Sequence, residues 1–206
     1  MNRQTAIINA AKGCYLRLGV AKTTAADIAA ESGISRATIY RHFESTEKIF
    51  MAVLAMESES MAKDCEQLLS PICDPRQRII KGILFCLNEI PRRPLHAHFF
   101  QSESKSWVAN QAVPAQVLHQ MIIDILQDRV GLRSITTQAQ AGAIDNLAEL
   151  ILRLIISYAM VPSHRARNDE QMSTFLHSVL DPTINDLLKL SASKSSLIKK
   201  NRNSPR

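Results

Sequence analysis

The fold is decided by residues 24–43, which read TAADIAAESGISRATIYRHF. Thr24 is a residue type that accepts a hydrogen bond at the start of a helix, and Asp27, three residues later, completes an acidic form of the capping box. Gly33 follows within about ten residues, and glycine readily takes the left-handed conformation that ends a helix. This stretch therefore begins with a short helix that stops at Gly33.

A second short helix follows the glycine. Ser35 is again a capping residue type, and the apolar positions behind it extend only to Phe43. Two such helices, with the small residue Ala29 where they cross closely, form a helix-turn-helix. Packing accounts for the small and apolar residues but not for the polar ones. These offer hydrogen-bond donors for the phosphates and base edges of a DNA major groove: Arg36, Thr38, Tyr40, Arg41 and His42.

Further helices are expected on both sides of this motif. The segment before it repeats apolar residues at helical spacing and ends at Gly19, a typical residue after a helix. Ser45 can cap a longer helix that continues through Ile49, Val53 and Met56. The chain has only six glycines, and most segments repeat apolar residues every three or four positions. We therefore expect an all-α fold without strands.

The run from Thr24 to Phe50, with ISRATIYRHF at its centre, resembles the TetR family of bacterial transcriptional regulators. The resemblance covers about residues 5–56. It implies an N-terminal three-helix DNA-binding domain, followed by a C-terminal helical domain that binds a ligand and dimerises. One position departs from the family pattern, because Thr46 stands where the family usually has Lys. This departure predicts weaker DNA binding but does not overturn the motif.

The resemblance also assigns roles by motif position. Arg36, Ala37 and Thr38 resemble residues that face base edges, whereas Thr24, Tyr40 and His42 resemble residues that contact phosphates. Thr46 can still donate through its hydroxyl and its backbone N–H at a helix N-terminus, and Lys48 can reach a phosphate one turn further on. The predicted DNA-binding residues are Thr24, Ser35, Arg36, Ala37, Thr38, Tyr40, Arg41, His42, Thr46 and Lys48.

Two long helical segments stand near the end of the second domain. Residues 139–160 are apolar on nearly all sides over much of their length, and such a helix must be covered all round. Residues 169–190 form a second long segment, expected to be kinked or broken near Pro182. We expect a homodimer in which these two helices of each copy form a four-helix interface. The predicted interface residues are Ile151, Leu154, Phe175 and Val179.

Aromatic residues make up only 5% of the chain, yet several fall in the middle of the second domain. They could line an apolar pocket for a small-molecule effector, and the alternative for each is ordinary core packing. The predicted ligand-binding residues are Phe85, Phe99, Phe100, Trp107, Met121 and Tyr158. No carboxylate or Cys completes a ligand cluster with His96, His98 and His119. We therefore expect no metal and no cofactor.

The net charge of +6 is unevenly distributed. Residues 1–50 hold seven Lys/Arg against four Asp/Glu, and residues 51–190 hold thirteen against fifteen. Residues 191–206 hold five bases and no acid, with a composition typical of disorder. Three regions are expected: a DNA-binding domain at 1–50, an effector-binding and dimerisation domain at 51–190, and a basic disordered tail at 191–206.

Other classes of protein fit the sequence poorly. The longest apolar stretch is too short for a membrane span of about 20 residues, and the N-terminal residues lack the apolar core of a signal peptide. The four cysteines show no C-x-x-C spacing, which favours the cytoplasm. A Gly-rich phosphate loop, a G-x-S-x-G elbow and an H-E-x-x-H motif are all missing from the sequence, so we do not expect an enzyme.

The sequence thus predicts a DNA-binding transcriptional regulator. We expect a ligand-responsive repressor that binds a palindromic, double-stranded operator as a homodimer and is released by a small, largely apolar effector. Two alternatives stay open at this point. The chain could be an activator of the same family, or a helical module that sequesters ligands and has lost DNA binding.

Overall fold

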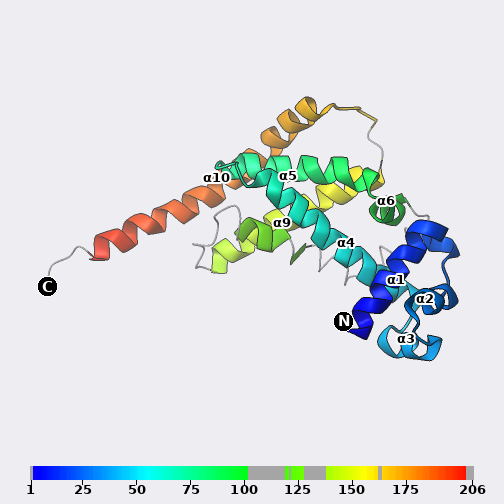
Figure 1. Ribbon diagram of the computed structural model, residues 1–206. Helices are drawn as coiled ribbons and strands as arrows, with labels where there is room; N and C mark the ends of the chain where they lie inside the picture. Colours follow the sequence, from blue (N-terminus) through cyan, green and yellow to red (C-terminus); the bar gives the residue numbers. More distant parts are fainter. Residues whose placement is uncertain (1, 102–118, 121, 128–137, 162–163, 203–206) are drawn as a thin grey trace. The chain divides into compact units, whose positions relative to one another are not determined.

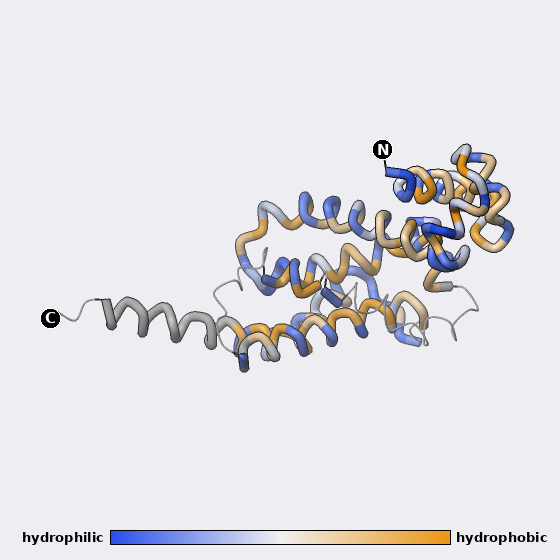
Figure 2. The backbone as a smooth tube through the Cα atoms, turned by 90° about the horizontal axis from the view of Figure 1, so that it is seen from below, coloured by the Kyte–Doolittle hydropathy of each residue, from blue (hydrophilic) through white to orange (hydrophobic). Residues whose placement is uncertain are grey.

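The computed structural model describes residues 2–101, 119–120, 122–127, 138–161 and 164–202 (Figure 1). Every regular element in these ranges is a helix, which confirms the predicted all-α fold. Figure 2 shows hydrophobic and hydrophilic residues alternating within single turns, as amphipathic helices require. The chain divides into two compact units: Met1–Gln67 with Glu89–Lys105, and Leu68–Asn88 with Ser106–Arg206.

The first unit begins with a small helical head. It contains α1 (Arg3–Leu18), α2 (Ala25–Ser32), α3 (Arg36–His42) and the first part of α4 (Thr46–Leu69). Gly19 and Gly33 follow α1 and α2 with φ of 87° and 67°, so both predicted glycine stops are confirmed. The buried side chains that hold the head together include Ile7, Ala11, Cys14, Tyr15, Ile28, Ile39, Phe43, Ile49, Phe50 and Val53.

The fold is continuous where the sequence predicted a domain boundary. Helix α4 passes through residue 50 without interruption, because it contains neither glycine nor proline between Thr46 and Leu69. Ser45 caps it as predicted, accepting a hydrogen bond from the Lys48 N–H at 3.3 Å. The expected division at residue 50 is therefore not a break between compact units.

Helix α6 (Pro94–Gln101) also belongs to the first unit. It follows a single 3₁₀ turn (Ile90–Arg92), and Pro94 occupies its first position, where a missing N–H costs nothing. The His98 ring lies edge-on to Phe50 at 5.9 Å, and Phe50 lies edge-on to Tyr15 at 5.5 Å. A segment assigned by the sequence to the second domain thus packs with the head.

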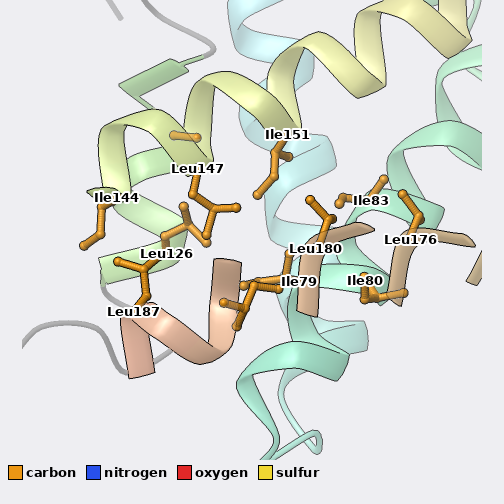
Figure 3. Close-up of a cluster of buried hydrophobic side chains, with 12 residues drawn as sticks. Ile79, Ile80, Ile83, Leu126, Ile144, Leu147, Ile151, Leu176, Leu180 and Leu187 are labelled. Atoms are coloured by element: carbon orange, nitrogen blue, oxygen red, sulfur yellow. The ribbon is translucent and has the colours of Figure 1, made fainter. Parts of the chain in front are cut away.

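The second unit is built around one hydrophobic core. Its helices are α5 (Pro75–Glu89), the helical residues 122–127, α9 (Gln138–Met160) and α10 (Asp169–Arg202). Figure 3 shows side chains from all of them converging. The core contains Ile79, Ile80, Ile83, Leu126, Ile144, Leu147, Ala148, Ile151, Leu176, Leu180, Ile184 and Leu187.

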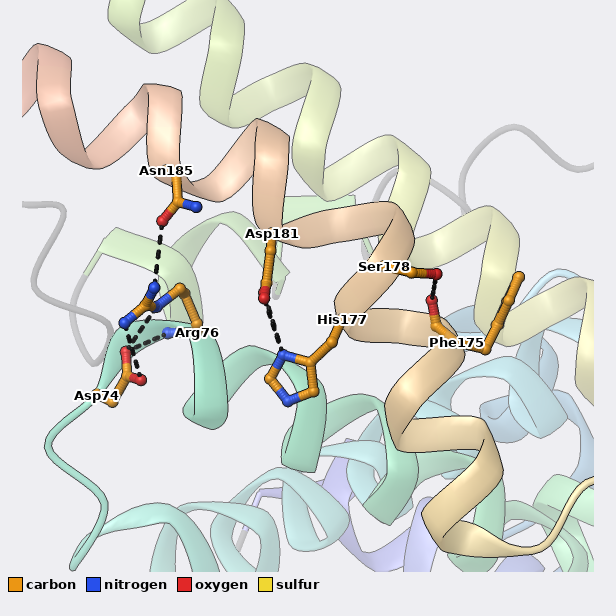
Figure 4. Close-up of polar contacts among 7 residues, drawn as sticks. All are labelled: Asp74, Arg76, Phe175, His177, Ser178, Asp181 and Asn185. Carbon is orange, nitrogen blue, oxygen red and sulfur yellow. Dashed lines mark hydrogen bonds and ion pairs between the residues drawn. The ribbon is translucent and has the colours of Figure 1, made fainter.

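Polar contacts join α5 to α10 at both ends. Arg76 donates to Asn185 Oδ1 at 3.5 Å and pairs with Asp74 at 3.3 Å (Figure 4). At the other end, Asn88 donates to Asp169 Oδ2 at 3.1 Å. Since the start of α5 meets the later part of α10, the two helices run antiparallel.

Helix α10 differs from the sequence prediction in two ways. Of the predicted kink or break at Pro182, the break does not occur, because Leu180 and Ile184 on either side are buried in the core and packing offsets the lost hydrogen bond. The helix also extends to Arg202, so residues 191–202 are helical where we predicted disorder. Glycine and proline are absent between 183 and 202, and nothing local ends the helix. Among the described residues, no helix is long and apolar enough to cross a membrane.

Candidate nucleic-acid interface

The first helix of the predicted motif starts with the capping box that its sequence indicates. The Asp27 N–H donates to Thr24 Oγ1 at 3.3 Å, and the Asp27 carboxylate accepts from the Thr24 hydroxyl at 2.6 Å and from its N–H at 2.8 Å. These bonds hold the pKa of Asp27 below its ordinary value of 3.8. Thr24 itself is exposed. The start of α2 is therefore fixed by side-chain chemistry at the surface.

The second helix, α3, is positioned by a turn and a cap. Gly33 supplies the left-handed turn, and Ser35 accepts a hydrogen bond from the Thr38 N–H at 3.2 Å. Ile39 is fully buried, and Phe43 is buried just after the helix ends. These contacts anchor one side of α3 in the head and leave its other side at the surface.

The predicted reading residues lie on that outer side. Arg36, Ala37, Tyr40, Arg41 and His42 are exposed, and Thr38 is half-buried beside the cap. Tyr40 keeps 45% of its surface exposed, which is unusual for so large a ring in a helix that buries its other face. The exposed side of α3 thus offers guanidinium, phenol, imidazole and hydroxyl donors within two turns.

The beginning of α4 is less basic than the motif would suggest. The pKa of Glu47 lies below its ordinary value of 4.5, chiefly because of hydrogen bonding with Ser45 and with its own backbone N–H, with a smaller contribution from Thr46. The Thr46 carbonyl accepts from Tyr15 Oη at 3.4 Å. Lys48 is exposed. Lys48 is therefore the exposed cation at this end, and it directly follows the acidic Glu47.

Ion pairs between helices hold the head together. Arg17 on α1 pairs with Glu31 on α2 at 2.9 Å, and Lys12 on α1 pairs with Glu57 on α4 at 2.6 Å. Both pairs are partly exposed, so each adds modestly to stability. Their geometric effect matters more, because α1 fixes both α2 and α4 around the recognition helix.

A short, capped helix with an exposed row of donors is how a helix-turn-helix reads DNA. Residues 7–53 match the family model for bacterial regulatory proteins, tetR family. Rv1255c of Mycobacterium tuberculosis, an uncharacterised HTH-type transcriptional regulator, is 22% identical over 85% of this chain and 84% of its own length. The N-terminal domain of this chain belongs to the TetR family.

Solved structures share the fold of this TetR-family chain. The TetR family repressor AlkX from Dietzia, implicated in biodegradation of n-alkanes, superposes with a TM-score of 0.68 at 17% identity, covering 89% of this chain and 95% of AlkX. Thermus thermophilus FadR, a TetR family repressor in complex with lauroyl-CoA, gives 0.58 at 17%, covering 90% and 93%. The matched family and the curated relatives are transcriptional regulators, which are not enzymes.

The structure divides the predicted ligand-binding residues of this regulator between its two units. Phe99 and Phe100 are buried in the first unit, with their rings edge-to-face at 5.1 Å. Phe85 and Tyr158 are half-buried in the second unit. Trp107 and Met121 lie outside the described residues. The described members therefore fall in two separate units, and their grouping into one ligand site stays a prediction.

The predicted dimer residues also have different environments. Ile151 is only 5% exposed and lies in the core of its own protomer, facing inward with Leu147 (Figure 3). Leu154 and Phe175 are half-buried against that core, and the Arg167 guanidinium lies 4.5 Å from the centre of the Phe175 ring. Val179 is 42% exposed. Of the predicted set, Val179 is therefore the one most open to a partner.

The first unit contains a buried polar pair that was not predicted from the sequence. Ser58 Oγ on α4 lies 3.1 Å from Nε2 of His96 on α6, and both residues are buried. The sequence pattern suggested only a metal ligand at His96, and among the described residues no group of three or more His, Cys, Asp or Glu side chains is placed to hold a metal. The available signal was the position of Ser58 within the apolar face of α4. His96 Nδ1 has no carboxylate partner in the described chain, so the pair lacks the third member of a hydrolytic triad.

Proposed function

We propose that this TetR-family regulator is a ligand-responsive repressor that binds a palindromic operator. The observation that carries the proposal is the outer side of α3, where Arg36, Tyr40 and Arg41 are exposed while Ile39 is fully buried. The caps at Thr24 and Ser35 fix this helix without using its outer side chains. A rigid element with outward donors suits the major groove.

We also propose that it acts as a homodimer. One recognition helix of two turns contacts too few base pairs for selectivity, and two copies related by a two-fold axis recognise a palindrome. Leu150 on α9 and Val179 on α10 are 37% and 42% exposed, although both are large apolar residues. Outward apolar side chains on the last two helices support an interface there.

The proposed effector is small and largely apolar. FadR of Thermus thermophilus was solved with lauroyl-CoA, and AlkX is implicated in n-alkane biodegradation, so two proteins of this fold are associated with hydrocarbon chains. The effector would release DNA by binding more tightly to a conformation in which the two heads are wrongly spaced. Binding can shift this equilibrium only by the difference in affinity between the two conformations.

The functional regions follow from these roles. Residues 1–50 would contact DNA in the cytoplasm, and residues 51–190 would bind the effector and dimerise. An activator would use the same contacts at a different operator position. A sequestering module would still bind the effector and dimerise but would no longer bind DNA.

Purified protein incubated with the intergenic DNA beside its own gene tests the proposal. We expect a salt-sensitive mobility shift with this DNA and a much weaker one with random DNA of equal length. Binding that shows no preference for any intergenic fragment would exclude the repressor and leave the sequestering module. Transcription from that promoter in vitro then separates repression from activation.

A further inference from the structure

Two buried polar side chains in the first unit bond to each other. Ser58 on α4 is 4% exposed and His96 on α6 is 3% exposed, and apart from tyrosine and cysteine they are the two polar side chains that are buried among the described residues. Ser58 Oγ and His96 Nε2 are 3.1 Å apart. Leu54 and Cys65, on the same face of α4 as Ser58, are buried and apolar. The polar pair is therefore inserted into an apolar helix contact.

The other ring nitrogen of His96 is what makes this pair informative. Nδ1 is buried and has no hydrogen-bond partner in the part of the chain that the structure describes. Buried polar atoms in native proteins are nearly always bonded to protein, water or a ligand, since an unmade bond destabilises the fold. His96 Nδ1 therefore points to a group that is not part of the described chain.

The charge around His96 limits what that group can be. Burial lowers the pKa of His96 and the nearby Arg93 lowers it further, while Glu57 acts in the opposite direction, so the ring is neutral at about pH 7. Arg93 is itself paired with Asp64 at 2.6 Å and with Glu89 at 3.2 Å. The described residues near His96 therefore provide no unpaired cation that could balance a buried anion. A neutral partner for Nδ1 fits best.

A neutral imidazole has one donor and one acceptor nitrogen. Depending on which nitrogen carries the proton, Nδ1 donates to a carbonyl oxygen or accepts from a hydroxyl. The next residues on the same face of α6 are Phe99 and Phe100, both buried and one turn beyond His96. The same face of α6 thus carries one unpartnered hydrogen-bonding atom and, one turn further on, two buried aromatic rings.

We propose that His96 Nδ1 is the hydrogen-bonding anchor of an effector site between α4 and α6, for a neutral molecule with an apolar body and one hydroxyl or carbonyl oxygen. Ser58 is a positioning residue that orients the ring through Nε2. This assignment rests on the proposed ligand response and specifies its chemistry.

The test uses the full chain and two pairs of probes that match in shape. p-Cresol and p-xylene differ by a hydroxyl against a methyl group, and cyclohexanone and methylenecyclohexane differ by a carbonyl against a methylene group. Protein labelled with ¹⁵N at histidine reports on the His96 ring by NMR. We expect an oxygenated probe to bind about fivefold more tightly than its hydrocarbon partner and to shift Nδ1 more than Nε2, the effect of about one net hydrogen bond.

Two variants separate ligand binding from a merely structural role. His96→Gln can place a polar atom near the Nε2 position and keep the bond to Ser58, whereas His96→Asn can place one near the Nδ1 position and loses that bond. We expect His96→Gln to abolish the preference for the oxygenated probe while its melting temperature stays close to that of the parent. His96→Asn should retain part of the preference and be the less stable of the two.

Three results would overturn the proposal. In the first, His96→Gln still prefers the oxygenated probe over its hydrocarbon partner. In the second, both members of each probe pair bind equally well. In the third, a water molecule occupies Nδ1 and no probe displaces it. The proposed function has its own readout, which is the affinity for operator DNA with and without probe. Probe binding at His96 that leaves this affinity unchanged would keep the site and reject the ligand-responsive repressor.

Discussion

Ser35 and Thr38 exchange hydrogen bonds at the start of the recognition helix. The Thr38 N–H donates to Ser35 Oγ at 3.2 Å, and the Ser35 hydroxyl donates to Thr38 Oγ1 at 3.0 Å. Because Thr38 Oγ1 accepts from Ser35, its own proton can be donated outward. The pair therefore fixes the first turn of α3. It also orients the hydroxyl of Thr38, whose position in the motif resembles one that faces base edges.

Replacing Ser35 with Ala removes both bonds. We expect the free energy of unfolding to fall by about 1 kcal/mol, the usual effect of losing a helix N-cap. Operator affinity should fall as well, since Arg36 and Thr38 follow the cap directly. Chemical denaturation measures the first effect and fluorescence anisotropy with labelled operator measures the second. Ser35→Thr keeps the hydroxyl and is the control, and an undiminished stability of Ser35→Ala would show that the cap does not stabilise α3.

Arg36 and Lys48 should contribute differently to DNA binding. Arg36→Ala is expected to weaken operator binding by about 1–3 kcal/mol and random-sequence binding much less, because a bidentate arginine discriminates between bases. Lys48→Ala should weaken both by a similar factor and reduce the slope of log affinity against log salt by about one. Anisotropy titrations over a range of salt concentrations measure both. Equal losses on operator and random DNA would remove Arg36 from base recognition.

The capping box at Thr24 predicts a pH dependence of stability. Hydrogen bonds from Thr24 hold the pKa of Asp27 below 3.8, so its stabilising effect is complete above that pH and is lost as the pH falls through the lowered value. Asp27→Asn does not titrate. The stability difference between the parent and Asp27→Asn should therefore shrink as the pH falls below 3.8, as followed by urea unfolding. A stability difference between the parent and Asp27→Asn that does not change with pH would contradict the capping role of Asp27. Thr24→Val removes only the hydroxyl bond to Asp27, so its stability should depend less on pH than that of the parent.

Local chemistry explains why the head was predictable. Thr24 and Ser35 each bond to a residue three positions away, and Gly33 acts through its own left-handed backbone, so their roles follow from the sequence alone. The same reasoning located Gly19 and Ser45 at helix ends. Residues 24–43, on which the functional interpretation depends, are thus also the segment whose structure depends most on neighbouring residues in the sequence.

The second unit was less predictable because its contacts are distant in sequence. Helix α9 is apolar on most sides, and composition cannot say that Ile151 faces the protomer core while Leu150 faces outward. The partner helix decides this, and here α5 and α10 cover the inner face. The placement of Phe99 with the head has the same origin, since it depends on how α6 packs.

Glu47 should oppose DNA binding at the start of α4. It is exposed and stands between Thr46 and Lys48, the two predicted phosphate contacts at this end. Glu47→Gln removes one negative charge, and a charge 4–8 Å from a phosphate in water contributes about 0.5–1 kcal/mol. Affinity for operator and random DNA should therefore rise about twofold to fivefold, most clearly at low salt, in the anisotropy assay. Glu44→Gln, an exposed neighbour outside this contact, is the control, and an equal gain from it would assign the effect to net charge alone.

Adjacent residues on α10 separate the proposed interface from the protomer core. Val179 is 42% exposed and Leu180 is fully buried. Val179→Asp should dissociate the dimer to a monomer in sedimentation experiments, because it places a charge on the apolar outer face. Leu180→Ala should instead lower the free energy of unfolding by about 2–5 kcal/mol through the cavity it leaves. At concentrations where it is folded, Leu180→Ala should still sediment as a dimer, since the outer face is unchanged. If Val179→Asp remains a dimer, the interface lies on another surface. The exposure of Val179 would then no longer support a dimer formed through α9 and α10.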